Sequence, residues 1–348
     1  MTTENKQYNY CLDFIKGVAC ICIVLMHCEF PGNLGVIVQT MSRFSVPFFF
    51  MVSGYFAMKV SRKKILHIAK ITLWASLFYL AFALVQHLIW HDMSFKVSKS
   101  QALIWLLFNQ PVIIAGPLWF CFALLYDYIL VSILDHFRFQ KYENVAGIIM
   151  LVLFFFMGQG IHLIGGGIPV PDFVQGDFGG NIPHMEGGRV PVPNFIYRNF
   201  LFEGYAFFML GRIIQKNKDR IKISNLALLA IIIVSTLLCF AERHWIGREF
   251  GVNLFTLPQL LALFIYGINN PTRHQGAVQR LGRDCSMLVY ILHPFVWYSL
   301  RRVYKAMDVA DNLTALYLMP IIVVVLSIAL ALFCNWFTKT VQSKKQAV

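Results

Sequence analysis

Residues 10–28 read YCLDFIKGVACICIVLMHC, and residues 41–59 read MSRFSVPFFFMVSGYFAMK. Both runs are almost entirely apolar, yet Asp13, Lys16, His27 and Arg43 lie within them or at their edges. An ionisable side chain at the centre of a membrane helix costs roughly 2.5 to 3.5 kcal/mol on insertion scales, so such residues usually mark a functional site. The two runs therefore predict membrane helices, joined by a short loop, that carry the function of the chain.

The spacing of the ionisable residues in the first run places them on one helix face. Lys16 and His27 are separated by about three turns of helix, with only ~20° left over, and by about 16 Å along the axis. Asp13 falls within about 60° of Lys16 and can pair with it at i,i+3. A cation and an imidazole are thus predicted on one stripe of the first helix, about half a bilayer apart.

The composition excludes an ordinary soluble domain. Hydrophobic residues make up 58% of the 348 residues and charged residues only 14%, whereas a soluble domain carries about 25% charged residues. We therefore expect an all-α integral membrane protein with a single bundle of about ten transmembrane helices. The segment 95–115 is too short to span and forms either an interfacial helix or an outer loop with one helical turn. The predicted spans are 10–28, 43–59, 66–90, 116–135, 145–163, 197–214, 224–242, 252–268, 285–304 and 314–337.

The net charge of +13 has a membrane explanation. Lys and Arg collect in cytoplasmic loops, and most of the 30 Lys and Arg residues fall on the same side of the predicted spans as the N-terminus. We expect both termini in the cytoplasm and no nucleic-acid partner. The predicted organisation is a cytoplasmic segment at 1–9, a membrane domain at 10–337 and a cytoplasmic tail at 338–348.

Two further features bear on function. The longest connection, 164–196, is rich in Gly and Pro and faces outward on this topology, where it forms either a lid over an outer site or a disordered spacer.

The eight cysteines lie nearly all in apolar runs, and none of their spacings resembles a zinc site, so they are expected to be small buried hydrophobes and no metal is expected.

His27 is the main candidate for chemistry. An imidazole titrates near neutrality and can take a proton from a hydroxyl and return it, although a lone His on an apolar helix is often a packing residue. Arg43 is either a headgroup anchor or a ligand for substrate oxygens. Ser53, Gly54 and Tyr55 lie toward the inner half of the second run, where a small residue most often permits close helix packing.

Several motifs resemble the membrane-bound acyltransferase-3 family. LDFIKG followed by VLMH gives Lys-x10-His, and the next helix gives RFSVPFFFMVSGYF, as in the first two helices of that family. GPLWFCFALL around Trp119, the segment Phe200 to Gly211, and LGRDCSMLVYILHPF around His293 resemble later family segments. The chain departs from the pattern at Gly116-Pro117, where the family often has His, and at Met287, where Tyr is expected.

The resemblance implies an O-acyltransferase that takes an acyl group, usually acetyl, from acetyl-CoA at the cytoplasmic side. The acceptor would be a hydroxyl of a cell-envelope glycan or lipid-linked saccharide at the outer side of a bacterial inner membrane, among membrane lipids. His27 would be the general base or the acyl carrier, Lys16 would contact donor oxygens and Asp13 would orient or neutralise Lys16. Further implied residues are Arg212 and Lys216, with Lys16, for the donor, and Arg43, Ser53, Tyr55, Trp119, Arg198, Glu203 and His293 for the substrate.

Other interpretations remain open. Arg198 and Glu203 are explained equally well as a structural ion pair, and His293 as a packing or hydrogen-bonding group. A transporter for a small solute such as an amino acid is the main alternative to the enzyme, because polar groups along one helix face also mark permeation paths. A third interpretation is a sensor that keeps the fold without the chemistry.

Overall fold

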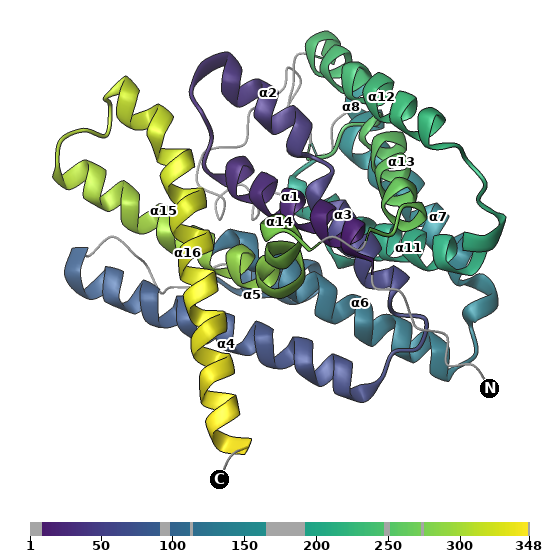
Figure 1. Cartoon of the computed structure of the whole chain (residues 1–348), viewed down its shortest axis with the longest axis horizontal. Coiled ribbons are helices and arrows are strands. Elements are labelled where there is room, and N and C mark those ends of the chain that lie inside the picture. Colours follow the sequence, from purple (N-terminus) through teal and green to yellow (C-terminus); the bar gives the residue numbers. More distant parts are fainter. Residues whose placement is uncertain are drawn as a thin grey trace. The chain divides into compact units, whose positions relative to one another are not determined.

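The computed structural model describes residues 9–90, 98–111, 114–164, 192–246, 251–272 and 275–346, all of them in helices, turns or irregular connections with no strand (Figure 1). Their contacts divide the chain into two compact units. Unit 1 lies within Met1–Phe48, Ile223–Gly247 and Phe255–Val348, and unit 2 lies within Phe49–Lys222 and Arg248–Leu254. The helix α3 (Ser45–Tyr55) begins in unit 1 and ends in unit 2.

Unit 1 is built around its first helix. Asn9 caps that helix by accepting a hydrogen bond at Oδ1 from the Leu12 amide at 3.1 Å, and its Nδ2 donates to the Gly267 carbonyl at 2.9 Å. A side-chain acceptor at this position satisfies one of the backbone amides that a helix start leaves open. The elements are α1 (Tyr10–His27), α2 (Gly32–Ser42), α12 (Asn225–Ile246), α13 (Thr256–Asn269), α14 (Ala277–Arg280), the π-helical turn η5 (Leu281–Cys285), α15 (Ser286–Ala306) and α16 (Leu313–Gln346).

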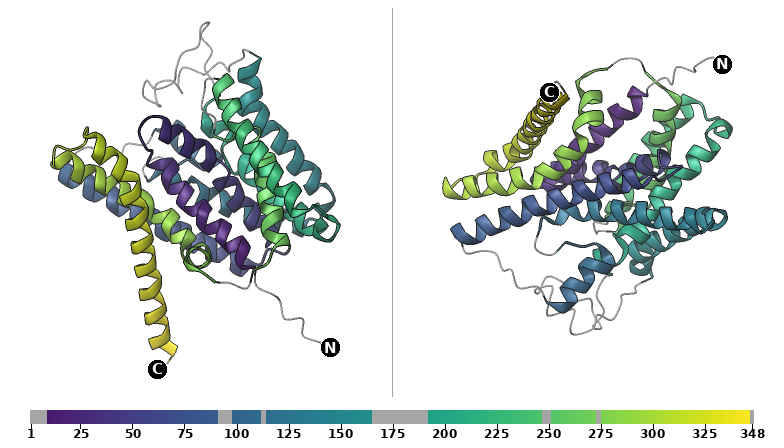
Figure 2. Two further views of the ribbon diagram at one scale, coloured as in Figure 1. Left: turned by 45° about the horizontal axis from the view of Figure 1, so that its top comes forward. Right: turned by 90° about the horizontal axis from the view of Figure 1, so that it is seen from below.

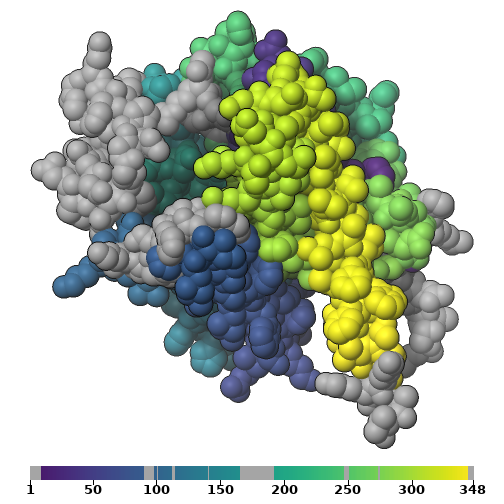
Figure 3. Space-filling model, turned by 90° about the vertical axis from the view of Figure 1, so that its left-hand side faces the viewer, coloured from purple at the N-terminus to yellow at the C-terminus, as the bar shows by residue number. Residues whose placement is uncertain are grey.

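Within unit 1, α12 packs against α13 and α15 packs against α16 (Figure 2). Figure 3 shows the C-terminal helix α16 in yellow at the molecular surface. Several of its large apolar side chains are exposed, among them Phe333, Trp336 and Phe337. A soluble protein rarely exposes so large an apolar surface. Lipid contact explains it, because the bilayer interior is as apolar as these side chains.

Unit 2 has an aromatic core between its longer helices. Phe50 of α3 lies 4.6 Å from Phe120 between ring centroids, and Phe154 lies 5.7 Å from Phe207. The elements of unit 2 after α3 are α4 (Arg62–Trp90), α5 (Lys99–Phe108), the 3₁₀ turn η1 (Gly116–Leu118), α6 (Trp119–His136), α7 (Gln140–Phe155), the π-helical turn η2 (Phe156–Gly160), α8 (Ile161–Leu163), α10 (Asn194–Tyr197), the π-helical turn η3 (Phe200–Gly204), α11 (Tyr205–Asn217) and the 3₁₀ turn η4 (Lys218–Arg220).

The all-α membrane class predicted from composition is confirmed. Each of the ten predicted spans coincides with helix in the described residues, and seven helices there are long and apolar enough to cross a membrane. The number of about ten spans and the cytoplasmic placement of the termini stay predictions. The seven are Tyr10–His27, Gly32–Tyr55, Arg62–Ile89, Gly116–His136, Lys141–Leu163, Asn225–Ile246 and Leu313–Ser343.

The expectation of a short loop between the first two runs is wrong. Residues Gly32–Ser42 form α2, a helix that begins directly after Pro31 and ends directly before Arg43. Its two glycines disfavour helix in an isolated peptide, so tertiary contact with α1 and α12 must stabilise it. Most of the predicted outer loop 164–196 lies outside the described residues, as does part of the segment 95–115, whose described part includes the ten-residue helix α5.

Candidate functional site

The close approach of α1 to α14, η5 and α15 positions the candidate residues of unit 1. A Cβ atom added at Gly282 would lie 1.9 Å from the Asp13 carbonyl oxygen, and one added at Gly17 would lie 2.4 Å from the Val278 carbonyl oxygen. No side chain fits at either position, so the glycines allow backbone to approach backbone. This contact holds the start of α1 against η5.

A second contact sets the register further along the two helices. Cys20 Sγ lies 3.6 Å from the Ser286 carbonyl oxygen, to which it donates. Two turns beyond each of these residues stands a histidine, and the rings of His27 and His293 stack with centroids 5.2 Å apart and planes 27° apart. Two parallel helices that advance by the same number of turns from one contact bring the next pair of side chains together as well. Two residues singled out in the sequence thus meet.

Lys16 and Asp13 form the predicted i,i+3 ion pair. Lys16 Nζ lies 3.1 Å from Asp13 Oδ1, with side-chain exposures of 19% and 6%. Asp13 Oδ2 is buried without a hydrogen-bond partner among the described residues. The helix that carries this pair runs unbroken to His27, so Lys16 and His27 lie on one face, as the spacing predicts.

A pair of half-buried charges lies near this pair at η5. Arg283 Nε and Nη2 donate to the two carboxylate oxygens of Asp284 at 2.8 and 3.1 Å. This hydrogen bonding is the main reason that the pKa of Asp284 lies below its ordinary value of 3.8; burial opposes it, and the charges of Arg283, Lys339 and Lys16 add to it. Lys16 therefore lies within the electrostatic reach of two carboxylates.

Arg43 follows α2 and binds back onto it. Its Nη2 donates to Gln39 Oε1 at 2.9 Å, and Gln39 is 2% exposed. Arg43 is half-buried, which leaves the choice between a headgroup anchor and a substrate ligand open.

Unit 2 brings Trp119 together with Arg198 and Glu203, the two residues that the sequence offered as acceptor ligands or as an ion pair. Arg198 Nε lies 3.2 Å from Glu203 Oε2, and the guanidinium carbon lies 5.5 Å from the centroid of Trp119. Glu203 is completely buried, whereas Arg198 is 23% exposed at its side chain. An arginine against an indole face and a carboxylate gains both cation–π and ionic attraction.

The local structure around Glu203 explains its burial. Asn199 caps η3 by accepting from the Leu201 and Phe202 amides at 2.9 and 3.2 Å. Asn109 donates to the Trp119 carbonyl at 3.1 Å and accepts from the Phe200 amide at 2.7 Å. The single side chain of Asn109 therefore links the start of α6 to η3. The π-helical turn η3 places Glu203 in the interior, and such turns are often found at functional sites.

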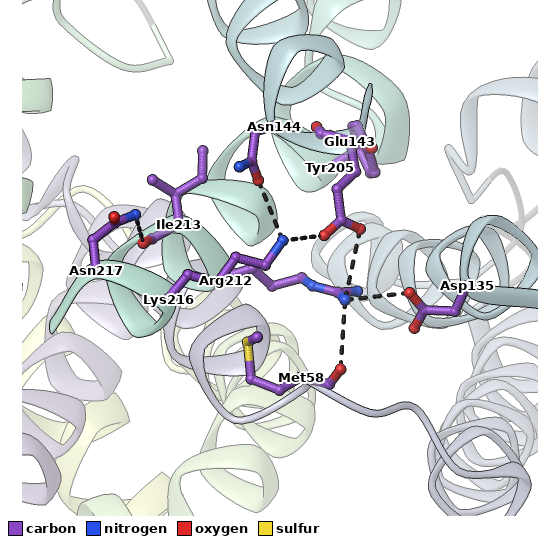
Figure 4. Close-up of polar contacts among 9 residues, drawn as sticks. All are labelled: Met58, Asp135, Glu143, Asn144, Tyr205, Arg212, Ile213, Lys216 and Asn217. Atoms are coloured by element: carbon purple, nitrogen blue, oxygen red, sulfur yellow. Dashed lines mark hydrogen bonds and ion pairs between the residues drawn. The ribbon is translucent and has the colours of Figure 1, made fainter. Parts of the chain in front are cut away.

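Arg212 and Lys216, predicted for the donor, lie in an ion-pair network of α6, α7 and α11 (Figure 4). The Glu143 carboxylate bridges the two cations: Oε1 accepts from Lys216, and Oε2 lies 3.6 Å from Arg212 Nη2. Arg212 Nη2 also lies 3.3 Å from Asp135 Oδ1 and 3.5 Å from the Met58 carbonyl oxygen. Arg212 is 2% exposed, and its Nε and Nη1 have no hydrogen-bond partner among the described residues.

Ser53 and Tyr55 flank a helix crossing in unit 2. A Cβ atom at Gly54 would lie 1.8 Å from the Phe208 carbonyl oxygen, and one at Gly211 would lie 2.0 Å from the Met51 carbonyl oxygen. Gly54 therefore allows α3 to pack closely on α11, as the sequence suggests for a small residue in this part of the helix. Ser53 and Tyr55 are half-buried beside that crossing.

Three carboxylates of unit 2 were not among the predicted residues. Asp135 and Glu143 flank a short basic connection between two spans, where the sequence offers no signal for pairing with Arg212. Asp127 did have a signal, because an acid in the middle of the apolar span 116–135 is expensive. It is 0% exposed, and neither of its carboxylate oxygens has a hydrogen-bond partner among the described residues.

Comparisons with known proteins give one family and one curated relative. The model of the acyltransferase-3 family, described as an acyltransferase domain, matches residues 9–339. The serine/alanine racemase of Enterococcus gallinarum is 23% identical over 352 residues, which cover 90% of this chain and 44% of the racemase. The chain thus spans less than half the length of that relative. No solved structure matches.

Proposed function

Because the chain belongs to the acyltransferase-3 family and is a multi-pass membrane acyltransferase, we propose that it moves an acetyl group from cytoplasmic acetyl-CoA to a hydroxyl of a cell-envelope glycan or lipid-linked saccharide. One observation carries this proposal. A single unbroken helix, α1, holds the Lys16–Asp13 pair near one end and His27 at the other, with the spacing that the resemblance requires.

The transfer proposed here needs one base and one site for negative charge. His27 takes the proton of the acceptor hydroxyl while the hydroxyl oxygen attacks the thioester carbonyl carbon. The carbon–sulfur bond breaks, and the leaving thiolate takes the proton from His27. Lys16 lies about 16 Å from His27 along the helix axis, so it contacts phosphate oxygens of the donor and not the reacting carbonyl. Asp13 lies 3.1 Å from the Lys16 ammonium group and orients it.

The network at Arg212 is proposed to bind the phosphate groups of the donor. Glu143 and Asp135 balance the charges of Lys216 and Arg212, so the network attracts an anion only weakly through net charge. Support comes from Arg212 itself, because two buried donor nitrogens without an acceptor are costly. A phosphate oxygen would satisfy them in the fork geometry that arginine offers.

The acceptor is proposed to bind at Trp119, Arg198 and Glu203. An indole face, a guanidinium group and a carboxylate provide apolar contact, hydrogen-bond donors and hydrogen-bond acceptors, which together suit a sugar ring with its hydroxyls. The orientation proposed from the distribution of Lys and Arg puts both termini in the cytoplasm of a bacterial cell.

The test is label transfer from radioactive acetyl-CoA to a glycan extract of the host by the purified protein in nanodiscs. The parent should transfer label, and His27→Ala should lower the rate by a factor on the order of 10² to 10⁴, the usual contribution of a general base. His67→Ala is the matched control, because His67 is an exposed histidine of α4. Undiminished transfer by His27→Ala would refute the assignment.

A second function is transport of a small solute such as an amino acid. It is favoured by the match of 90% of this chain to a relative that its name connects with serine and alanine. Counter-flow of labelled serine into proteoliposomes separates the two functions. The transporter would be supported if the parent takes up serine but transfers no acetyl group, and if the His27→Ala variant takes up serine as well.

A further inference from the structure

The connection between α6 and α7 exposes aromatic rings beside cations. It reads FRFQKY over residues 137–142, and Phe137, Phe139 and Tyr142 are 64%, 50% and 60% exposed. Arg138 and Lys141 are exposed as well, and Lys141 Nζ lies over the Tyr142 ring, 5.6 Å from its centroid. A cluster of large exposed apolar side chains with a polar surround marks an interaction surface.

The two acids nearest to these cations in the sequence do not neutralise them. Asp135 Oδ1 lies 3.3 Å from Arg212 Nη2, and the completely buried carboxylate of Glu143 bridges Arg212 and Lys216 (Figure 4). Neither cation of the connection forms an ion pair with an acid in the part of the chain that the structure describes. The connection therefore offers two positive charges to a partner outside the chain.

Arg138 occupies a backbone position that favours glycine. The connection ends α6 in a Schellman motif, in which the Phe139 amide donates to the Leu134 carbonyl at 2.9 Å and the Arg138 amide donates to the Asp135 carbonyl at 3.3 Å. This motif requires a left-handed residue, and Arg138 has a φ of 59°. A side chain with a Cβ atom is strained in that region. Such strain is found where the side chain serves a function.

The connection lies between two membrane spans. The helical segments on either side of it, Gly116–His136 and Lys141–Leu163, are both long and apolar enough to cross a membrane, so residues 137–142 meet the lipid headgroups at one membrane surface. Aromatic side chains and basic side chains with long apolar stems are favoured in this layer, because it is apolar on one side and wet on the other.

We propose that residues 137–142 bind the headgroup of an anionic phospholipid. Phe137 and Phe139 contact the acyl chains next to the headgroup, and Arg138 and Lys141 bind the phosphodiester oxygens. A zwitterionic headgroup carries its own cation, whereas an anionic headgroup such as that of phosphatidylglycerol leaves its negative charge for the two cations of the connection. The inference does not depend on the proposed acyl transfer.

The test measures lipid affinity and needs no substrate. Native mass spectrometry of the protein in a neutral detergent, titrated with phosphatidylglycerol, gives the dissociation constant of the tightest lipid. Arg138→Asn removes the cation and tolerates the left-handed backbone, so the variant should fold. Combined with Lys141→Gln, it should weaken binding by about 25-fold, or about fivefold for each cation near an anionic lipid. Arg138→Lys keeps the charge and should bind as the parent does.

A matched control separates a local site from a general effect of charge. Lys218→Gln with Arg220→Gln removes two exposed cations of η4. These residues directly follow α11, whose Lys216 binds Glu143 beside the α6–α7 connection. The control should leave the dissociation constant nearly unchanged. An equal loss in the control and in the Arg138→Asn, Lys141→Gln variant would overturn the inference.

Two further ligands separate a lipid from other anions. Phosphatidylcholine carries the same acyl chains without net charge, and sn-glycero-3-phosphoglycerol is the anionic headgroup without acyl chains. Both should bind more weakly than phosphatidylglycerol, and Phe137→Ser with Phe139→Ser should weaken binding of the lipid but not of the free headgroup. Equal affinity for the two lipids, or for the lipid and its free headgroup, would overturn the inference.

Discussion

Cys20 of α1 donates to the carbonyl group of Ser286 in α15 at 3.6 Å, and each of the two residues lies two turns before a histidine. The equal advance along both helices explains why His27 and His293 stack although more than 260 residues separate them in the sequence. A substitution that shifts the start of α1 against η5 and α15 should therefore also change the stacking of His27 and His293.

The first prediction concerns the close backbone contact between Gly282 of η5 and Asp13 of α1. Gly282→Ala would place a Cβ atom 1.9 Å from the Asp13 carbonyl oxygen, and backbone cannot move aside as a flexible side chain can. We expect a loss of about 1 to 3 kcal/mol in stability and a fall in acetyl transfer. Thermal unfolding in detergent measures the first and label transfer the second. Gly116→Ala is the matched control, because nothing lies within 4 Å of a Cβ atom there, and its melting temperature should equal that of the parent.

The second prediction concerns the carboxylate that bridges Arg212 and Lys216. Glu143→Gln would leave the buried Arg212 with Asp135 as its one remaining carboxylate among the partners described above. Removing one partner of a buried ion pair costs about 3 to 5 kcal/mol, so the melting temperature should fall clearly. Asp219→Asn, at an exposed acid of η4, should have no effect. A stable Glu143→Gln protein would show that the network is not needed for folding.

The third prediction tests whether Arg198 and Glu203 act as one unit. Arg198→Met should destabilise the protein because it leaves a completely buried carboxylate without its cation. Arg198→Met combined with Glu203→Gln should cost less than the sum of the two single changes, by about 0.5 to 3 kcal/mol of coupling. A double-mutant cycle of unfolding free energies measures this coupling. Additive effects would contradict the ion pair.

The fourth prediction concerns Lys16 and the donor. Lys16→Gln removes a positive charge. In the structure this charge pairs with Asp13, and in the proposed reaction it also contacts the oxygen atoms of the donor. The KM for acetyl-CoA should rise and kcat should fall by about tenfold or more, since hydrogen bonds to charged groups contribute about 1.5 to 3 kcal/mol. Lys16→Arg keeps the charge and should retain most of the activity. Initial rates over a range of acetyl-CoA concentrations give both constants, and equal rates for Lys16→Gln and the parent would exclude this role.

The fifth prediction concerns acid stability at η5. Because Arg283 holds the pKa of Asp284 below 3.8, the folded protein keeps this carboxylate ionised where the unfolded chain would protonate it. Its stabilising contribution is present above the ordinary pKa and is lost as the pH falls through the lowered one. Asp284→Asn should therefore lower the melting temperature at pH 6 and make less difference near pH 3. If the difference in melting temperature between Asp284→Asn and the parent grew toward low pH, it would contradict this prediction.

The membrane class and the stripe on α1 could be predicted from the sequence because both depend on local order. An apolar run of sufficient length forms a spanning helix wherever it stands, and the helical repeat alone puts Asp13, Lys16 and His27 on one face. The helix α2 could not be predicted in this way, since its short, glycine-containing segment is helical only through contact with other helices.

The tertiary structure alone decided which distant residues meet. It brought His293 to His27, Trp119 to Arg198, and Glu143 to Arg212. Such pairs depend on the crossing and register of helices, which are set at a few close backbone contacts such as Gly282 on Asp13. The periodicity of a sequence records which face a residue occupies, but it does not record which helix lies against that face.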